Sequence, residues 1–267
     1  MKYKIMLLIA AVSLVVTGSC GNDSIEGADG MKIIFLHHST GNIIWNGGVK
    51  KWFKNYNKEN KTRYRIKERA FPSKSPYGWN NYPYDYWNIW VKNAGPKKYM
   101  KEPTLEILTK KYDLIIFKHC FPVSNIVPCP AGGPSVDSDV KSMKNYKLQY
   151  NALKEKMLSF PECKFLIWTG AALVEGATDE VSARRSREFF EWVRGEWDSS
   201  GDNIYIWDFY ELETGGGLYM KDEYAVSSTN SHPTAEFADM AAPVFCRRIV
   251  DIMEDKPDST DVRSEKL

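Results

Sequence analysis

The chain has 267 residues, and its 36 Lys and Arg residues nearly balance its 34 Asp and Glu residues, which leaves a formal net charge of +2 at pH 7. A charge this small gives no reason to expect nucleic acid as a partner. Hydrophobic residues make up 43% of the chain and aromatic residues 13%, enough to bury the core of one large α/β domain.

The first twenty residues have the features of an export signal. Lys2 and Lys4 precede an apolar run, 5–16, that is too short for a comfortable membrane span. Small residues before Cys20 and a polar stretch after it resemble a bacterial lipoprotein signal, although Thr17 stands where leucine is usual. The resemblance implies a lipidated Cys20, a flexible tether over 21–30 and an extracytoplasmic protein held on a bacterial membrane by its lipid only. An ordinary secretory signal that contains a cysteine is the alternative.

Segments typical of strands and helices alternate along the rest of the chain. The apolar run at 32–38 predicts a first strand, and Trp45, Val49 and Phe53, spaced by four, predict a helix over 43–56. The charged tail, 254–267, is expected to be disordered. Further strands are expected at 63–71, 112–117, 164–169 and 203–207, and further helices at 103–111, from Asp137 or Ser138 to 160, from a Thr178 cap onward and at 234–253.

Five strands that alternate with helices predict one three-layer α/β/α domain over 31–253, a flavodoxin-like fold with a five-stranded parallel sheet. In such sheets the active site lies at the carboxyl ends of the strands. Ser39, the loop that begins at His119 and the loop after Thr169 all follow strands, and the loop 209–231 delivers His232 to the same edge. The chain order therefore predicts that these segments meet.

Ser39 and His232 have the chemistry of a nucleophile and its base. A serine at a strand-to-helix turn presents its hydroxyl at the sheet edge, where backbone N–H groups can stabilise an oxyanion. The histidine would take the hydroxyl proton and return it to the leaving group. Alternatively, Ser39 only caps the following helix and His232 is a surface residue before a proline.

All four histidines of the chain, His37, His38, His119 and His232, fall at this predicted edge. A cleft with several histidines can bind zinc, so a metal-dependent hydrolase is one alternative. No H-x-H or H-x-x-x-H spacing supports it, and the adjacent His37 and His38 would point to opposite sides of a strand. We expect no metal and no cofactor.

Two short blocks resemble the SGNH (GDSL-like) hydrolase superfamily. The run Phe-Leu-His-His-Ser-Thr-Gly at 35–41 is similar to the first block of that family, where a strand ends in Gly-Asp-Ser. Ser-His-Pro at 231–233 is similar to the last block, Asp-x-x-His-Pro. The resemblance implies an ester hydrolase whose oxyanion donors are the backbone N–H groups of Ser39 and Gly78 and the side chain of Asn125.

The third member of the triad departs from the family pattern. The family's acid lies three residues before the histidine, and that position is Thr229 here. Asp222, in the same loop, is the favoured substitute. Glu223, Asp208 and a Ser–His dyad assisted by a backbone carbonyl remain alternatives.

An aromatic segment over 71–91 bears on the substrate. Its rings either pack over the sheet edge, as we expect of Trp87 and Trp90, or offer a platform on which a sugar can stack. The expected function is hydrolysis of an acyl ester, with acetyl favoured, on a carbohydrate; the alternatives are a metal-dependent hydrolase and a non-catalytic glycan-binding lipoprotein. The oligomeric state stays open. Residues expected to contact the substrate are His38, Trp79, Asn80 and His119, and the segment's rings are Tyr77, Trp79, Tyr82, Tyr84, Tyr86, Trp87 and Trp90.

The four cysteines after Cys20 suggest no structural zinc site, because none forms a C-x-x-C pair. Cys120 and Cys129 share a loop region, so a disulfide between them is possible outside the cytoplasm. Cys163 and Cys246 have the character of small buried residues.

Overall fold

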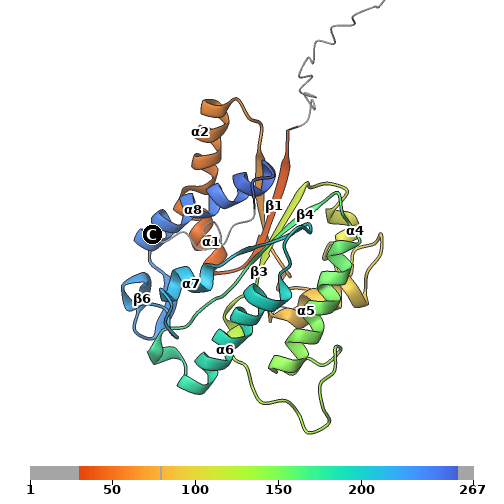
Figure 1. Ribbon diagram of the computed structural model, residues 1–267, viewed down its shortest axis with the longest axis vertical. Coiled ribbons are helices and arrows are strands. Elements are labelled where there is room, and N and C mark those ends of the chain that lie inside the picture. The colour runs from red at the N-terminus through yellow and green to blue at the C-terminus, as the bar shows by residue number, and fades with distance from the viewer. Residues whose placement is uncertain (1–29, 79, 258–267) are drawn as a thin grey trace, which may run out of the picture.

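The computed structural model describes residues 30–78 and 80–257, so the export signal, Cys20 and Trp79 lie outside the described residues. Its centre is a five-stranded parallel sheet in the order β2-β1-β3-β4-β5 (Figure 1). Helices cover both faces of this sheet, which confirms the predicted three-layer α/β fold. The strands are β1 (Lys32–His37), β2 (Arg65–Ala70), β3 (Leu114–Lys118), β4 (Lys164–Trp168) and β5 (Ile204–Trp207).

Burial along the strands explains their places in the sheet. All five residues of β3 are buried, as expected for the central strand of a sheet covered on both faces. The strand β2 has no fully buried residue and carries charged side chains, which suits an edge strand because charge discourages pairing with another chain.

Two groups of helices cover the sheet. Figure 1 shows α1, α2 and α8 together beside one face, and α4 and α5 beside the other. The first group comprises α1 (Thr40–Ile44), η1 (Trp45–Val49), α2 (Lys50–Asn60), α7 (Phe209–Thr214) and α8 (Ala235–Met253). The second comprises α3 (Pro83–Trp87), η2 (Asn88–Lys92), α4 (Leu105–Leu108), α5 (Met143–Leu158), α6 (Glu180–Trp192) and η5 (Val193–Trp197). Short helices η3 (Phe121–Ser124), η4 (Glu175–Ala177) and η6 (Asp222–Tyr224) lie in the connecting loops, and β6 (Ala225–Ser227) pairs with β7 (Asn230–Pro233) as a hairpin.

Each face of the sheet has its own apolar core, built largely from aromatic rings. On the α8 face, Trp168 stacks on Phe35 with ring centroids 4.8 Å apart and meets Phe245 edge-on at 4.7 Å. On the α5 face, Tyr86 stacks on Phe117 at 5.1 Å. Large rings bury much apolar area per residue, so these two layers hold the sheet and its carboxyl edge in place.

The structure differs from the sequence-based elements mainly in the loops. The aromatic segment contains α3, which begins at Pro83, a residue suited to the first turn of a helix. The cap of α6 is Asp179 rather than Thr178, because its carboxylate accepts the Ser182 N–H at 2.9 Å. The helix α5 begins at Met143, later than expected, after a Ser142 cap. The helix α7 and the β6–β7 hairpin were not expected from the sequence.

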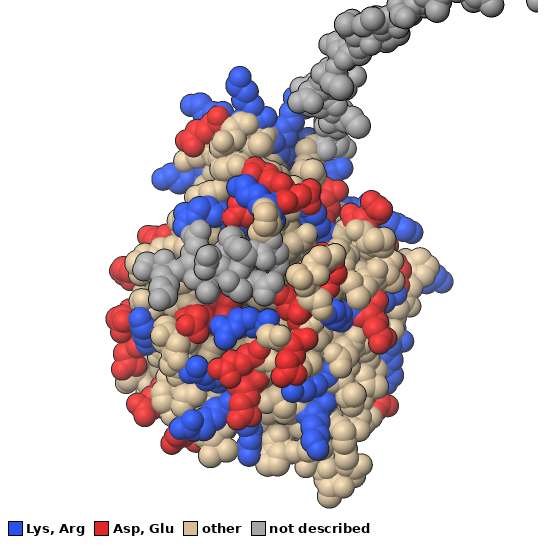
Figure 2. Space-filling view, in the orientation of Figure 1, with Lys and Arg blue, Asp and Glu red and all other residues tan. Residues whose placement is uncertain are grey.

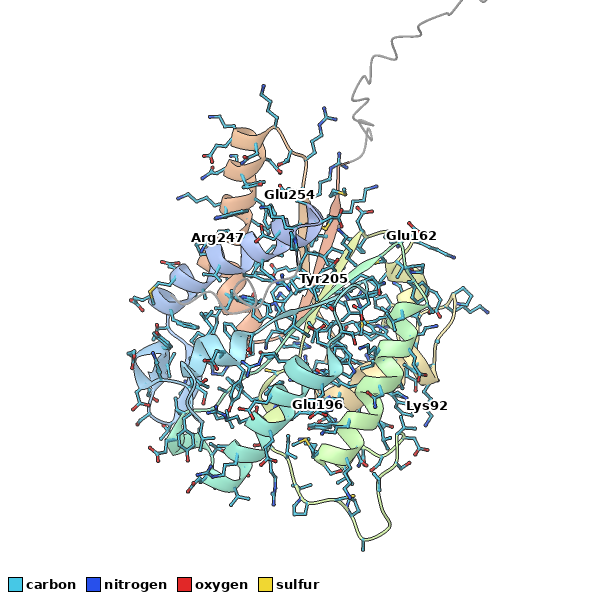
Figure 3. The ribbon with its side chains drawn as sticks, in the orientation of Figure 1. Lys92, Glu162, Glu196, Tyr205, Arg247 and Glu254 are labelled. Carbon is cyan, nitrogen blue, oxygen red and sulfur yellow. The ribbon has the colours of Figure 1, made fainter. Side chains whose placement is uncertain are left out.

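The surface and the cysteines add little to the assignment of function. Figure 2 shows positive and negative side chains interspersed over one face. Glu254, labelled in Figure 3, lies where α8 ends near α2 and accepts a hydrogen bond from the Tyr56 hydroxyl at 2.8 Å. Cys120 and Cys129 are free thiols, and Cys163 and Cys246 are buried. No helix within 30–78 and 80–257 is long and apolar enough to cross a membrane.

Candidate active site

Ser39 occupies the turn between β1 and α1 in a strained backbone conformation. Its φ is 40° and its ψ −102°, outside the regions that a serine ordinarily adopts. The turn is also crowded, because a Cβ at Gly41 would lie 2.5 Å from the Cβ of His37. The fold therefore holds the Ser39 hydroxyl in one place at the carboxyl edge of the sheet.

His232 lies against this hydroxyl. The distance between Ser39 Oγ and His232 Nε2 is 2.5 Å, although the two residues are 193 positions apart in the chain. The Phe121 ring meets the imidazole edge-on, with ring centroids 5.0 Å apart. The structure thus brings the predicted nucleophile and base within hydrogen-bond distance.

Asn230 binds the other nitrogen of the imidazole. Its Oδ1 lies 2.7 Å from His232 Nδ1 and also accepts the backbone N–H of His232 at 3.2 Å. A backbone N–H can only donate, so the amide atom that faces it is the oxygen. The same oxygen then requires a proton on Nδ1, which leaves the Nε2 lone pair free to accept the Ser39 hydroxyl proton.

The hairpin of β6 and β7 holds His232 in position. Ser231 Oγ accepts the Val174 N–H at 3.0 Å, which ties β7 to the loop that follows β4. On the other side, the Thr234 N–H donates to the Tyr224 carbonyl at 2.9 Å, and the Thr234 side chain caps α8. Both neighbours of the His232–Pro233 pair are therefore fixed by hydrogen bonds.

The carboxylates expected to complete the triad do not occupy that position. Asp222 and Glu223 are exposed in η6, and the described contacts of His232 include neither. Asp208 is buried, but its oxygens accept from Thr169 Oγ1 at 2.6 Å and Arg194 at 2.8 Å while it caps α7. Thr229 lies in the hairpin turn. The partner is Asn230, two residues before the histidine instead of three, and an amide in this position does not match the family pattern of an acid.

The three expected oxyanion donors differ in their surroundings. The first hydrogen-bonded N–H groups of the α1 turn belong to Gly41 and Asn42, so those of Ser39 and Thr40 precede the helical ladder. The N–H of Gly78, by contrast, donates to the Lys74 carbonyl at 3.1 Å, and a group already committed in a turn is a poor donor to substrate. Asn125 is exposed just after η3.

Of the residues expected to contact substrate, two are engaged within the protein. His119 is fully buried and its Nε2 lies 2.8 Å from the Tyr150 hydroxyl, so it is a core residue and does not touch substrate. His38 is half-buried, with its Nε2 2.5 Å from the Pro72 carbonyl. Asn80 is exposed in the segment after β2.

The aromatic segment mostly packs, as we expected of Trp87 and Trp90. Both of these rings are buried, and so are Tyr82 and Tyr86. Tyr77 stays partly exposed while its hydroxyl donates to Asp85 Oδ1 at 3.1 Å.

The electrostatics of the site favour neutral histidines. Burial, and then the positive charge of Lys118, lowers the pKa of His232. The same two causes lower the pKa of His37 and of His119, each to about 3. A neutral His232 at neutral pH is the form that a general base requires.

Within the described ranges, no three His, Cys, Asp or Glu side chains lie close enough together to hold a metal ion.

Neither a family profile nor a curated protein matches the sequence. Several solved structures are similar at low identity, among them the following three. An acetyl xylan esterase is 13% identical over 84% of this chain and 98% of its own, with a TM-score of 0.47. A gut microbial diltiazem-metabolizing enzyme is 11% identical over 82% and 46%, with a TM-score of 0.48. A family 2 carbohydrate esterase of Corynascus thermopiles (Myceliophthora fergusii) with a carbohydrate binding domain is 10% identical over 84% and 67%, with a TM-score of 0.44. At these identities the likeness concerns the fold alone.

Proposed function

We propose that the protein is a serine ester hydrolase. The observation that carries this proposal is the 2.5 Å approach of Ser39 Oγ to His232 Nε2 at the carboxyl edge of the sheet. A hydroxyl in that position loses its proton to the imidazole as its oxygen attacks the ester carbonyl carbon. The imidazolium then protonates the leaving alcohol, and water, activated by the same histidine, releases the acid from the acyl-enzyme.

Asn230 takes the orienting role that an acid has in most such sites. Its amide oxygen fixes the tautomer of His232 through Nδ1, which is the geometric part of the role. The amide is neutral, so it stabilises the imidazolium less than a carboxylate would. The site is therefore a Ser–His–Asn arrangement, and the exposed Asp222 is not needed.

The oxyanion donors in this proposal are backbone groups at the start of α1. The N–H groups of Ser39 and Thr40 precede the first intrahelical donor, and both lie beside the nucleophile. Asn125 is retained as a side-chain donor from the loop after β3. The N–H of Gly78 is not one of the proposed donors, because it already donates to the Lys74 carbonyl.

A small acyl ester of a carbohydrate, with acetyl favoured, is the proposed substrate. Tyr77 is a partly exposed ring that can pack against a sugar, and it belongs to the same segment as Pro72, whose carbonyl contacts His38. Attachment through a lipidated Cys20, outside the cytoplasm, remains a proposal that rests on the signal sequence alone.

Turnover of p-nitrophenyl acetate and of acetylated oligosaccharides tests the function. Ser39→Ala and His232→Ala should each reduce kcat by roughly 10³-fold or more, because the pair acts as a unit. Ser228→Ala, which removes an exposed hydroxyl in the hairpin turn, should leave kcat unchanged. Ser39→Ala with wild-type turnover would refute the proposal. Sugar binding without any turnover by the wild type would favour a glycan-binding protein instead.

A further inference from the structure

A lysine is fully buried at the end of the central strand, close to the Ser39–His232 pair. Lys118 is the last residue of β3, and its side chain has an exposed fraction of 0%. Its Nζ has no hydrogen-bond partner among the described residues. A buried ammonium without a hydrogen bond is costly, and packing alone does not explain it because methionine would fill similar space without that cost.

Strand register places Lys118 on the face that carries the nucleophile. Leu36 of β1 pairs with Phe117 of β3, so Lys118 lies beside His37, two residues before Ser39. Leu114 and Ile116 pack in the core under α1 and α8, and alternation along the strand puts Lys118 on that side. The side chain therefore lies on the face that α1 covers, next to the turn that holds Ser39.

Glu213 is a buried acidic side chain near Lys118. It is fully buried in α7, whose Phe209 and Leu212 pack in the same core as Leu114 and Ile116. One of its oxygens accepts the Ala172 N–H at 2.8 Å, and the other has no partner among the described residues. Burial raises the pKa of Glu213 to about 8, so its carboxyl is neutral in mildly acidic solution and does not offset a charge on Lys118. Burial also lowers the pKa of Lys118, while Cys120 and then Glu213 oppose that shift.

Other titratable groups also lie near Lys118. His37 ends β1 beside it, His38 follows His37, and His119 and Cys120 follow Lys118 in the chain. The pKa of His37 and of His119 is about 3, so both are neutral in mildly acidic solution. Burial lowers the pKa of His232, and the charge of Lys118, at the end of β3, lowers it further.

We propose that the Lys118 ammonium, buried at the end of β3, is a positioning residue that keeps His232 unprotonated in mildly acidic solution. Its positive charge disfavours a second positive charge on the imidazole, so the base stays available below the pH at which an ordinary histidine is protonated. The inference rests on the proposed function, because only there does a neutral His232 matter. The consequence is an esterase that keeps its activity in mild acid.

The test measures the pKa of His232 by NMR titration of its ring, which does not depend on activity. In Lys118→Met and Lys118→Gln this pKa should rise by at least half a unit, and the acid limb of kcat/KM should move to higher pH by the same amount. Lys164→Met, which removes a lysine from the opposite end of the adjacent strand, should move neither. An unchanged pKa of His232 in a folded Lys118 variant would overturn the proposal.

A measurement on the wild type covers the case in which neither variant folds. The ¹⁵N shift of Lys118 Nζ reports its charge directly, and we expect an ammonium between pH 5 and pH 7. A neutral amine in that range would overturn the inference. If the wild type hydrolyses no ester but the NMR results hold, the proposed function fails and the electrostatic assignment stands.

Discussion

Asn230 Oδ1 lies 2.7 Å from His232 Nδ1 and accepts the backbone N–H of the same histidine. The segment 230–232 therefore sets the tautomer of the imidazole by itself, and no acid from elsewhere in the fold is needed. The opposite nitrogen, Nε2, then faces Ser39. Asn230 is therefore the residue on which the orientation of the proposed base depends.

Removal of the Asn230 side chain should impair catalysis without unfolding the protein, because Asn230 is exposed. In Asn230→Ala the imidazole loses its Nδ1 acceptor, and kcat/KM should fall roughly 10- to 100-fold, part of what a well-placed base contributes. Asp222→Asn is the matched control and should match the wild type. Loss of activity in Asp222→Asn, with Asn230→Ala fully active, would reassign the partner to Asp222.

Asn230→Asp should change the pH profile in a defined direction. A carboxylate beside Nδ1 stabilises the imidazolium, so the pKa of His232 should rise and the acid limb of kcat/KM should move to higher pH. The measurement is kcat/KM for p-nitrophenyl acetate from pH 4.5 to pH 8. An acid limb that stays in place would show that this side chain does not sense the charge on His232.

The wild-type pH profile should itself reflect the environment of His232. Burial and Lys118 lower the pKa of this group below its ordinary value of 6.5. As pH falls, kcat/KM should therefore reach half its plateau value below pH 6.5 and decline tenfold per unit below the lowered pKa. A half-maximal point above pH 6.5 would contradict this environment.

Two buried histidines should make folding stability depend on pH. The pKa of His37 and of His119 is about 3 in the folded protein, whereas an unfolded chain takes up protons near pH 6.5. Above pH 6.5 both histidines are neutral in the folded and in the unfolded protein, so the free energy of unfolding is highest there. As pH falls toward 3, each buried histidine lowers this free energy by up to about 1.4 kcal/mol per pH unit. Urea unfolding of His119→Gln between pH 5 and pH 6.5 should show a slope smaller by about 1 kcal/mol per unit. The same slope as the wild type would exclude a neutral, buried His119.

Enlarging Gly41 should disturb the nucleophile turn. A Cβ there would lie 2.5 Å from His37 Cβ and 2.7 Å from His37 Cγ, both held in the buried end of β1. Gly41→Ala should cost about 1–3 kcal/mol of stability, as overpacking does, and should lower kcat/KM at least tenfold. Gly132→Ala, where a Cβ meets no atom within 4 Å, should change neither quantity. Wild-type kinetics in Gly41→Ala would mean that the turn can relax without moving Ser39.

The sequence predicted the sheet well because its strands are short apolar runs that end up buried. The runs at 32–38, 112–117 and 164–169 correspond to β1, β3 and β4 within two residues at each end. The meeting of Ser39 and His232 followed from chain order, since both were placed at the carboxyl edge of one parallel sheet.

Features set by tertiary contacts were missed. The strands β6 and β7 are three and four residues long and mostly polar, so they carry no periodic signal. Asn230 acquires its role only when the hairpin folds its amide back toward His232. His119 was expected beside the substrate because it follows a strand, but its ring turns into the core toward Tyr150. Lys118 ends an otherwise apolar strand, and only the register shows that it lies near Ser39.

Covalent labelling with a fluorophosphonate is the most direct test of whether Ser39 is a nucleophile activated by His232. Such reagents react with activated serine hydroxyls, and the position of the adduct is read by mass spectrometry of peptides. We expect one adduct, on Ser39, that is lost in His232→Ala and kept in Ser228→Ala. An adduct on another serine, or ester turnover by a protein whose Ser39 stays unlabelled, would contradict it.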